Sequence, residues 1–253
     1  DVVIGYLHRG IEKLCEHRDW TQIVLITDRM DYVAAATNNL GYCETVEKLM
    51  SLEVPRRAHY IRTLLSELQR IASHLVWLGS HAMDIGAVTV FLYCLREREL
   101  ALDLFEEYCG ARLTYNCMRI GGLPFDLPPG FDRKVRAFCD IVDEKVLEYE
   151  TLLTQNRIWL ERTRQVGVIS AEDAVAIGLS GPALRASGVL RDVRKDEPYA
   201  AYGEVAFDIP LGSAGDTYDR YLVRLEEFRQ STRIIRQVLD GMPEGPVMGK
   251  VPR

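Results

Sequence analysis

Residues 54–86, with the sequence VPRRAHYIRTLLSELQRIASHLVWLGSHAMDIG, decide the fold of this chain. Pro55 lies at a first-turn position, where the N–H group that proline lacks is not needed. Gly79 and Gly86 loosen the end of the helix without fixing where it stops. The apolar residues recur at helical spacing and predict one continuous stripe: Ile61, Leu64, Leu65, Leu68, Ile71, Ala72, Leu75 and Leu78.

Helical periodicity extends to both sides of this segment. Residues 30–52 predict a first long helix, and residues 88–109 predict a third that becomes charged towards its end. A connector with three glycines and three prolines, RIGGLPFDLPPGF, occupies residues 119–131. After it, residues 132–159 predict an amphipathic helix and residues 217–242 a final long helix.

The segment between the last two predicted helices has a different character. Residues 160–215 contain several glycines and predict only one short helix, while EVAFDIP at 204–210 alternates like a short strand. We therefore expect a mainly α protein, a helical bundle with small β elements at its margins.

The ends of the chain also carry a prediction. The first ten residues, DVVIGYLHRG, resemble the end of a strand, and GPVMGKVPR at 245–253 is a Pro/Gly coil. These ends indicate a fragment truncated on both sides. The expected single domain has an entry segment with a strand end (1–30), a bundle core (31–159), an irregular α/β insertion (160–215), and a C-terminal helix and tail (216–253).

Composition narrows the classes of function. The 253 residues are 47% apolar, which is ample for a core, and carry a net charge of −6 that argues against a nucleic-acid binder. No apolar run approaches the ~18 residues of a membrane span. The six cysteines form no CxxC pair, so we expect reduced, buried thiols in a cytoplasmic protein rather than a metal centre: Cys15, Cys43, Cys94, Cys109, Cys117 and Cys139.

Histidines and common motifs give no catalytic assignment. The sequence has no phosphate-binding glycine loop, no GxSxG nucleophile motif and no HExxH zinc motif. His74 and His81 lie seven residues apart on one helix face, with Asp84 near its end. A metal site would need further ligands from other helices, so we interpret the histidines as satisfied polar core residues.

Asp84 lies among apolar neighbours in HAMDIGAV. Desolvation there would disfavour the charged carboxylate and make Asp84 a candidate proton donor to a reducible ligand. A helix cap is the alternative, and the residues alone favour it.

Tyr32 follows Asp31, three residues after Arg29. Its hydroxyl could donate a hydrogen bond to a carbonyl and stabilise developing negative charge, although packing is the commoner role of a helical tyrosine. The RERE run at 96–99 predicts a solvated or interhelical salt-bridge face.

A resemblance to a known family rests on eight segments in chain order. They are GYLHRGIEKL, DRMDY, ELQRIASHL, DIGAVTVF, RERE, RIGGLPFDLP, LRASGV and DVRKDEPY. Over essentially the whole chain they resemble the D-type, quinone-site subunit of bacterial NADH–quinone oxidoreductase (respiratory complex I). More distantly, the chain resembles the large subunit of nickel–iron hydrogenases, which implies a hydrogenase large-subunit-like fold.

The hydrogenase resemblance explains the DRMDY motif. In those enzymes the stretch has the pattern Arg-x-Cys-Gly-x-Cys, and its cysteines hold the nickel–iron centre. Here Asp31 and Ala34 occupy the cysteine positions and Tyr32 occupies that of the glycine. Thiolate ligation by this motif is impossible, so the resemblance implies a ligand pocket in place of a metal site.

The complex I resemblance assigns the pocket residues. It implies that Tyr32 hydrogen-bonds the quinone head group with Asp84 beside it as a proton source. It also implies that Ser80, Met83 and Phe91 line the same cavity. A second head-group ligand, a histidine in an N-terminal hairpin, would precede this chain, and a closing segment would follow it.

Two further positions correspond to residues near an iron–sulfur cluster. Arg9 matches an arginine that lies against the terminal tetranuclear cluster of an adjacent small subunit. Thr114 stands where many members have a histidine that contacts this cluster, and threonine does not titrate. Because Thr114 replaces a histidine that titrates, the sequence gives no support for a pH-dependent reduction potential of the cluster. The replacement is compatible with a lower-potential quinone such as menaquinone.

The resemblance also implies cofactors, partners and location. The substrate would be ubiquinone or menaquinone, and iron–sulfur clusters and FMN would reside in partner subunits. Expected partners are the cluster-bearing small subunit, an adjacent peripheral-arm subunit and the membrane-arm subunit at the quinone entrance, with no nucleic acid. The protein would lie peripherally on the cytoplasmic side of the bacterial cell membrane and be inactive as an isolated chain.

Three alternatives stay open from the sequence. The chain could be the large subunit of a membrane-bound hydrogenase, although both motif cysteines are absent. It could belong to a related complex fed by ferredoxin or the deazaflavin F420. It could also be a non-catalytic scaffold onto which the cluster-bearing subunit docks.

Overall fold

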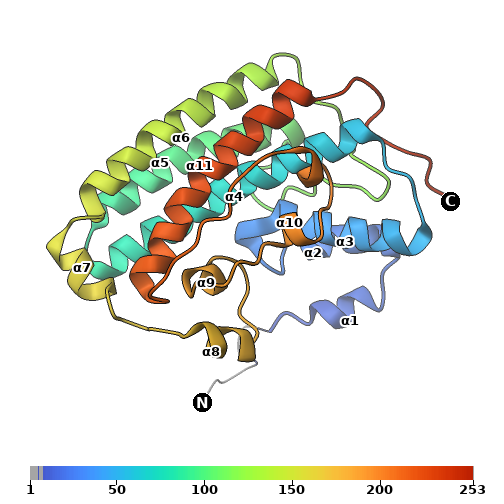
Figure 1. Ribbon diagram of the computed structural model, residues 1–253. Coiled ribbons are helices and arrows are strands. Elements are labelled where there is room, and N and C mark those ends of the chain that lie inside the picture. Colours follow the sequence, from blue (N-terminus) through green and yellow to red (C-terminus); the bar gives the residue numbers. More distant parts are fainter. Residues whose placement is uncertain (1–4, 6–7, 253) are drawn as a thin grey trace.

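The computed structural model describes residues 5 and 8–252, and its helices are arranged as shown in Figure 1. The part of the chain described contains eleven α-helices and two short 3₁₀ turns. In chain order these are α1 (Ile11–Cys15), α2 (Trp20–Thr27), η1 (Tyr32–Ala34), α3 (Ala35–Met50), α4 (Arg56–Ile85), α5 (Val88–Cys109), α6 (Phe131–Leu153), α7 (Arg157–Thr163), α8 (Ala171–Ala176), α9 (Gly181–Ala186), α10 (Val193–Asp196), η2 (Tyr202–Glu204) and α11 (Thr217–Gly241).

Four long helices, α4, α5, α6 and α11, form the bundle (Figure 1). The central helix is α4, which packs against α5 and α11, while α6 packs against both of these. Every residue of the predicted α4 stripe is at most 1% exposed, so this prediction is confirmed. The mainly α fold class is confirmed as well. In the part described, no helix is both long and apolar enough to cross a bilayer.

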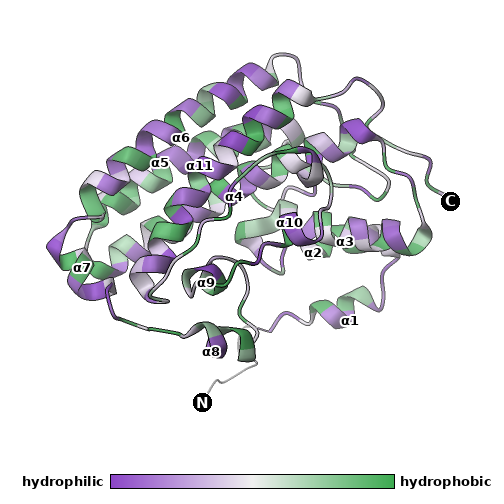
Figure 2. Ribbon diagram, viewed as in Figure 1, coloured by the Kyte–Doolittle hydropathy of each residue, from purple (hydrophilic) through white to green (hydrophobic). Residues whose placement is uncertain are grey.

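Amphipathic patterning places α6 at the surface of the bundle. Its buried residues recur every three or four positions, and hydrophobic and hydrophilic residues alternate along the ribbon in Figure 2. The predicted continuous helix over 132–159 is interrupted after Leu153. The Asn156 side chain accepts hydrogen bonds from the N–H groups of Ile158 and Trp159 and so starts α7 as a separate helix.

The two glycines of the fold-deciding segment have different roles. Gly86 ends α4 in the left-handed region (φ 104°), and its N–H bonds to carbonyls of the last turn. Gly79 does not end the helix. A Cβ atom there would lie 3.2 Å from the Cys94 Cβ and 3.3 Å from the Phe91 ring, so Gly79 lets α5 approach α4 closely. Pro55 is the residue immediately before α4 rather than part of its first turn.

The predicted β elements are largely wrong. Among the described residues only isolated bridges occur, pairing Gly122 with Arg119 and with Met248. Residues 204–210 form no strand, because side chains of α11 satisfy their backbone: Gln237 bonds the N–H and C=O of Ala206, and Gln230 accepts from the Asp208 N–H. The strand end expected at the N-terminus lies mostly outside the described residues.

The segment 160–215 is therefore irregular and helical rather than α/β, with three short helices where one was predicted. The cysteines largely match expectation. All six are free; four are buried, and Cys15 and Cys109 are partly exposed. Burial raises the pKa of the Cys43, Cys94 and Cys139 thiols to about 12, so these thiols stay protonated at neutral pH.

Candidate functional site

A cavity of about 540 Å³ lies where the entry helices meet η1 and the loop that follows α5. Three residues singled out in the sequence, Arg9, Tyr32 and Thr114, line it together. They come from segments far apart in the chain, so the fold rather than the sequence brings them together. The remaining lining residues are His8, Gly10, Ile11, Glu12, Arg29 and Met30.

Tyr32 is presented to this cavity by a backbone that is held at several points. The Asp31 carboxylate accepts the N–H of Val33 at 3.2 Å, so the residue at the first cysteine position of the hydrogenase pattern is a turn cap here. The Gln69 amide of α4 donates to the Val33 carbonyl at 2.7 Å. The Tyr32 side chain is nevertheless 62% exposed, which leaves its hydroxyl available to a ligand.

The walls of the cavity carry more positive than negative side chains. Arg9 and Arg29 contribute guanidinium groups, and Glu12 is the one carboxylate among the described residues of the lining. The Arg29 side chain folds back to the Leu25 carbonyl at the end of α2. This charge balance favours a ligand that gains negative charge during its reaction.

Asp28 directly precedes Arg29 of this site in the chain, and it was missed in the sequence. It is fully buried, its Oδ2 accepts the Asn116 N–H at 3.0 Å, and its Oδ1 has no hydrogen-bond partner. Burial raises the pKa of Asp28 to about 6. The carboxylate anchors a loop in which Thr114 (φ 52°) and Asn116 (φ 46°) are left-handed. The only sequence signal was a carboxylate directly after the apolar α2.

Asp84, Ser80, Met83 and Phe91 form a second group around the α4–α5 turn and do not line the cavity beside Tyr32. Ser80 lies eleven residues after Gln69, about 16 Å along the helix axis. The Ser80 hydroxyl donates to the Val76 carbonyl at 2.8 Å. The two groups are therefore carried by one helix but not by one cavity.

The predicted desolvation of Asp84 is wrong for the chain as described. Asp84 is exposed, because its apolar neighbours Met83 and Val88 are themselves 40% and 53% exposed and cover nothing. Nor does Asp84 cap a helix start, since it lies in the last turn of α4.

The histidines behave as core residues in part. His74 lies against Glu227 of α11, with Nε2 and Oε2 2.6 Å apart, which confirms a satisfied polar role. His81 is half-buried, and its ring centroid lies 5.1 Å from that of Trp159.

The charged runs RERE (96–99) and RKDE (194–197) form contacts with neighbouring helices, and not with each other. In RERE, Arg96 reaches Glu148 of α6, and Glu97 accepts from the Tyr149 hydroxyl at 2.9 Å, which confirms an interhelical face. In the later RKDE run, Arg194 is buried against Glu67 of α4.

Two protein-family models match different, partly overlapping parts of the chain. The family model described as "Respiratory-chain NADH dehydrogenase, 49 Kd subunit" matches residues 84–253. The model described as "Nickel-dependent hydrogenase" matches residues 9–98, which include Tyr32 and most of the residues that line its cavity.

Relatives in several bacteria are similar along nearly the whole chain. The D 2 subunit of the NADH-quinone oxidoreductase of Solibacter usitatus is 57% identical over 99% of this chain and 68% of its own length. The corresponding D 2 subunit of Thermodesulfovibrio yellowstonii is 55% identical over 97% of this chain and 61% of its own length. The D subunit of the Geotalea uraniireducens enzyme is 54% identical over 99% of this chain and 64% of its own length. The chain thus spans about two thirds of the length of these relatives.

Proposed function

The chain belongs to the 49 kDa subunit family of respiratory-chain NADH dehydrogenases, and on that premise we propose that it forms the quinone head-group pocket of an NADH–quinone oxidoreductase. The observation that carries the proposal is the cavity in which Tyr32 meets Arg9 and Thr114. The segment matched by the hydrogenase family contains Arg9, Arg29 and Tyr32 of this cavity, but its motif has Asp31 and Ala34 where thiolate ligands would stand. These substitutions support a ligand pocket in place of a metal centre.

In this proposal Tyr32 orients the quinone and Asp84 helps to supply protons. The exposed Tyr32 hydroxyl donates a hydrogen bond to one quinone carbonyl, and the bond strengthens as negative charge develops on that oxygen. Ser80, Met83 and Phe91 line the rest of the ligand's path at the α4–α5 turn. Asp84, on the same turn, delivers a proton directly or through a group from outside this chain.

The positive wall has a part in the same reaction. Arg9 faces the cluster of an adjacent small subunit, and Arg9 and Arg29 favour the arrival of negative charge. Thr114 leaves the cluster contact without a titrating side chain. Partner subunits supply the electrons through flavin and iron–sulfur clusters, so the isolated chain is inactive.

The assembly follows from these roles. The cluster-bearing subunit covers the Arg9 side of the cavity, an adjacent peripheral-arm subunit packs beside it, and a membrane-arm subunit completes the quinone entrance. The chain thus lies peripherally on the cytoplasmic face of the membrane.

The decisive experiment is Tyr32→Phe in the intact complex. We expect quinone-dependent NADH oxidation to fall at least tenfold, while NADH oxidation by an artificial acceptor that takes electrons upstream is unchanged. Tyr93→Phe is the matched control, since it removes a hydroxyl from a half-buried tyrosine outside the cavity. Full quinone activity in Tyr32→Phe would overturn the site assignment and favour a scaffold role.

A further inference from the structure

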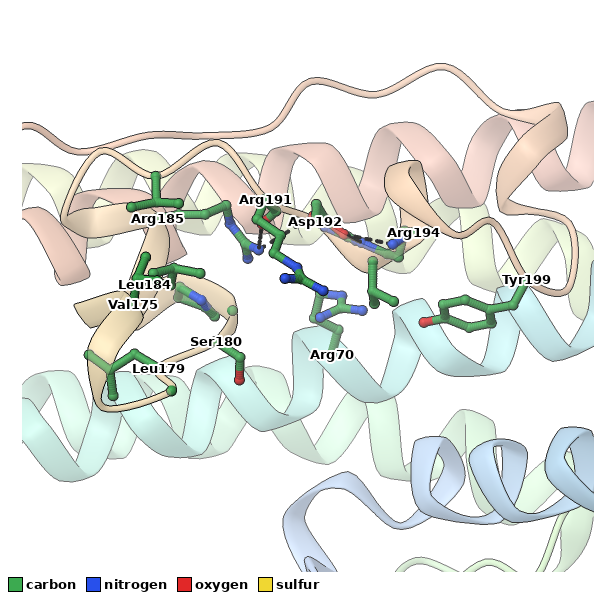
Figure 3. Close-up of a pocket in the computed structure, with 15 residues that line it drawn as sticks. Arg70, Val175, Leu179, Ser180, Leu184, Arg185, Arg191, Asp192, Arg194 and Tyr199 are labelled. Carbon is green, nitrogen blue, oxygen red and sulfur yellow. Dashed lines mark hydrogen bonds and ion pairs between the residues drawn. The ribbon is translucent and has the colours of Figure 1, made fainter. Parts of the chain in front are cut away.

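A second cavity, of about 630 Å³, lies between α4 and the segment that carries α8, α9 and α10 (Figure 3). Among the described residues, four arginines and one carboxylate line it: Arg70, Arg185, Arg191, Arg194 and Asp192. Most of the remaining wall is aliphatic, from Val175, Leu179, Leu184, Val189 and Val193. The cavity therefore combines a cationic part with an apolar part.

Two of the arginines are largely neutralised by the protein itself. Arg194 makes a two-point contact with Asp192, with Nη2 2.7 Å from Oδ2 and Nε 3.0 Å from Oδ1. Arg185 is 3% exposed and pairs with Glu227, but its Nε has no hydrogen-bond partner. The buried guanidinium of Arg185 thus keeps one donor without a partner.

The other two arginines lack a full complement of partners. Arg70 shares Glu67 at 3.2 Å with Arg194, and that carboxylate also accepts from two hydroxyl groups. Arg191 is exposed and makes no ion pair within the described part of the chain. Figure 3 shows the Arg191 and Arg70 side chains entering the cavity from opposite walls with their guanidinium groups turned toward one another.

The charges of this region do not balance. Three guanidinium groups, of Arg70, Arg185 and Arg194, share the carboxylates of Glu67, Asp192 and Glu227, and Arg191 has no ion pair among the described residues. Two of these carboxylates already have other donors: Glu67 accepts from Tyr202 and Ser231, and Glu227 lies against His74. Two converging cations in a partly enclosed cavity repel one another until an anion lies between them.

We propose that this cavity binds a small ligand with an oxyanion head, a carboxylate or a phosphate, and a short aliphatic body. Arg70 and Arg191 grip the head from two sides, because planar guanidinium groups match the paired oxygens of both anions. The aliphatic wall covers the body of the ligand. The volume lies within the range usual for small-molecule sites, roughly 300–1,000 Å³.

Titration calorimetry of the full-length protein with hexyl phosphate and with hexanoate tests the proposal. We expect one-to-one binding of at least one anion and weakening by roughly tenfold or more in Arg191→Gln, since one charge-assisted contact is lost. Arg191→Lys, which keeps the charge but loses the two-point geometry, should weaken binding less. The stronger of the two anions identifies the head group as phosphate or carboxylate.

Arg133→Gln is the matched control, because Arg133 is an exposed arginine of α6 outside the cavity. Its binding should equal that of the wild type. The unfolding temperature of ligand-free Arg191→Gln should be no lower than that of the wild type, which separates lost binding from lost folding. The proposal fails if neither anion binds, if hexanol binds as tightly as the anions, or if Arg133→Gln weakens binding as much as Arg191→Gln.

Discussion

On one side of α4, the Glu67 carboxylate is fully buried and accepts hydrogen bonds from Tyr202, Ser231 and Arg194. On the side that meets η1, Tyr32 is held only through its backbone and leaves its hydroxyl in the open. Burial alone would raise the pKa of Glu67, but Arg70 and Arg194 outweigh it and lower the pKa to about 2. The first region uses its polar groups to fix the fold, and the second leaves them available for chemistry.

The comparison shows that a shifted carboxylate pKa is not by itself a sign of function. The pKa of Glu67 is strongly shifted although Glu67 lines neither of the two cavities, whereas the proposed role of Tyr32 depends on the accessibility of its hydroxyl. Structural ion networks perturb pKa values as strongly as active sites do. Substitutions in the two regions should therefore separate stability from activity.

The largest expected effect comes from Glu67→Ala. It leaves Arg194 and Arg70 without their shared carboxylate in the bundle core, so the free energy of unfolding should fall by about 3–5 kcal/mol. Urea unfolding of the full-length protein measures this. Glu161→Ala, which removes an exposed pair with Arg157, should change stability by less than about 0.5 kcal/mol. Equal losses in both variants would contradict the comparison.

The next largest effect on stability is expected for Asp28, whose contribution to the free energy of unfolding depends on pH. Its pKa is raised to about 6, so the folded state binds this proton more tightly than the unfolded chain does. The stability that Asp28 contributes is full near pH 4 and is lost as the pH rises through 6, an effect of roughly 2–3 kcal/mol. Asp28→Asn should therefore gain stability relative to the wild type between pH 4.5 and pH 7. A relative loss over that range would show the opposite sign of linkage.

Gln69 links the two regions, since it lies two residues from Glu67 and binds the backbone of η1. Gln69→Ala should lower the free energy of unfolding by about 1–2 kcal/mol, because the Val33 carbonyl and the Ala36 N–H lose their partner. Hydrogen exchange should report faster exchange of the Ala36 amide, with α11 amides unchanged. If the α11 amides accelerate equally, the two regions unfold as one.

The smallest effect on stability is expected for Tyr32→Phe. The Tyr32 hydroxyl has no hydrogen bond within the described chain, and the side chain is exposed. The free energy of unfolding should therefore change by less than about 0.5 kcal/mol. Thermal unfolding beside the quinone assay makes the contrast sharp. A stability loss above about 1 kcal/mol would mean that Tyr32 packs rather than binds.

Much of the bundle could be predicted because helix ends and apolar stripes are local features. The helix predicted at 88–109 coincides with α5, since Gly110 supplies the left-handed residue at its end. Residues 204–210 could not be predicted, because their hydrogen bonds come from Gln230 and Gln237, which only the folded chain brings near.

The site shows the same limit. The cavity unites Arg9, Tyr32 and Thr114 across more than a hundred residues, and only a family resemblance connected them beforehand. The expectation that Asp84 is desolvated was wrong, because apolar residues next to it in the sequence do not cover its side chain in the fold. Asp28 escaped notice because its burial and its hydrogen bond with the Asn116 N–H depend on a part of the chain distant in sequence.

The Asp31 cap also limits the evolution of this motif. A cysteine at position 31 would remove the hydrogen bond to the Val33 N–H at a cost of about 1 kcal/mol, and one thiolate without a partner at position 34 binds metal weakly. Metal ligation by this motif thus needs two substitutions, of which the first is a loss on its own. The capped turn therefore opposes the gain of a metal-binding motif by single mutations.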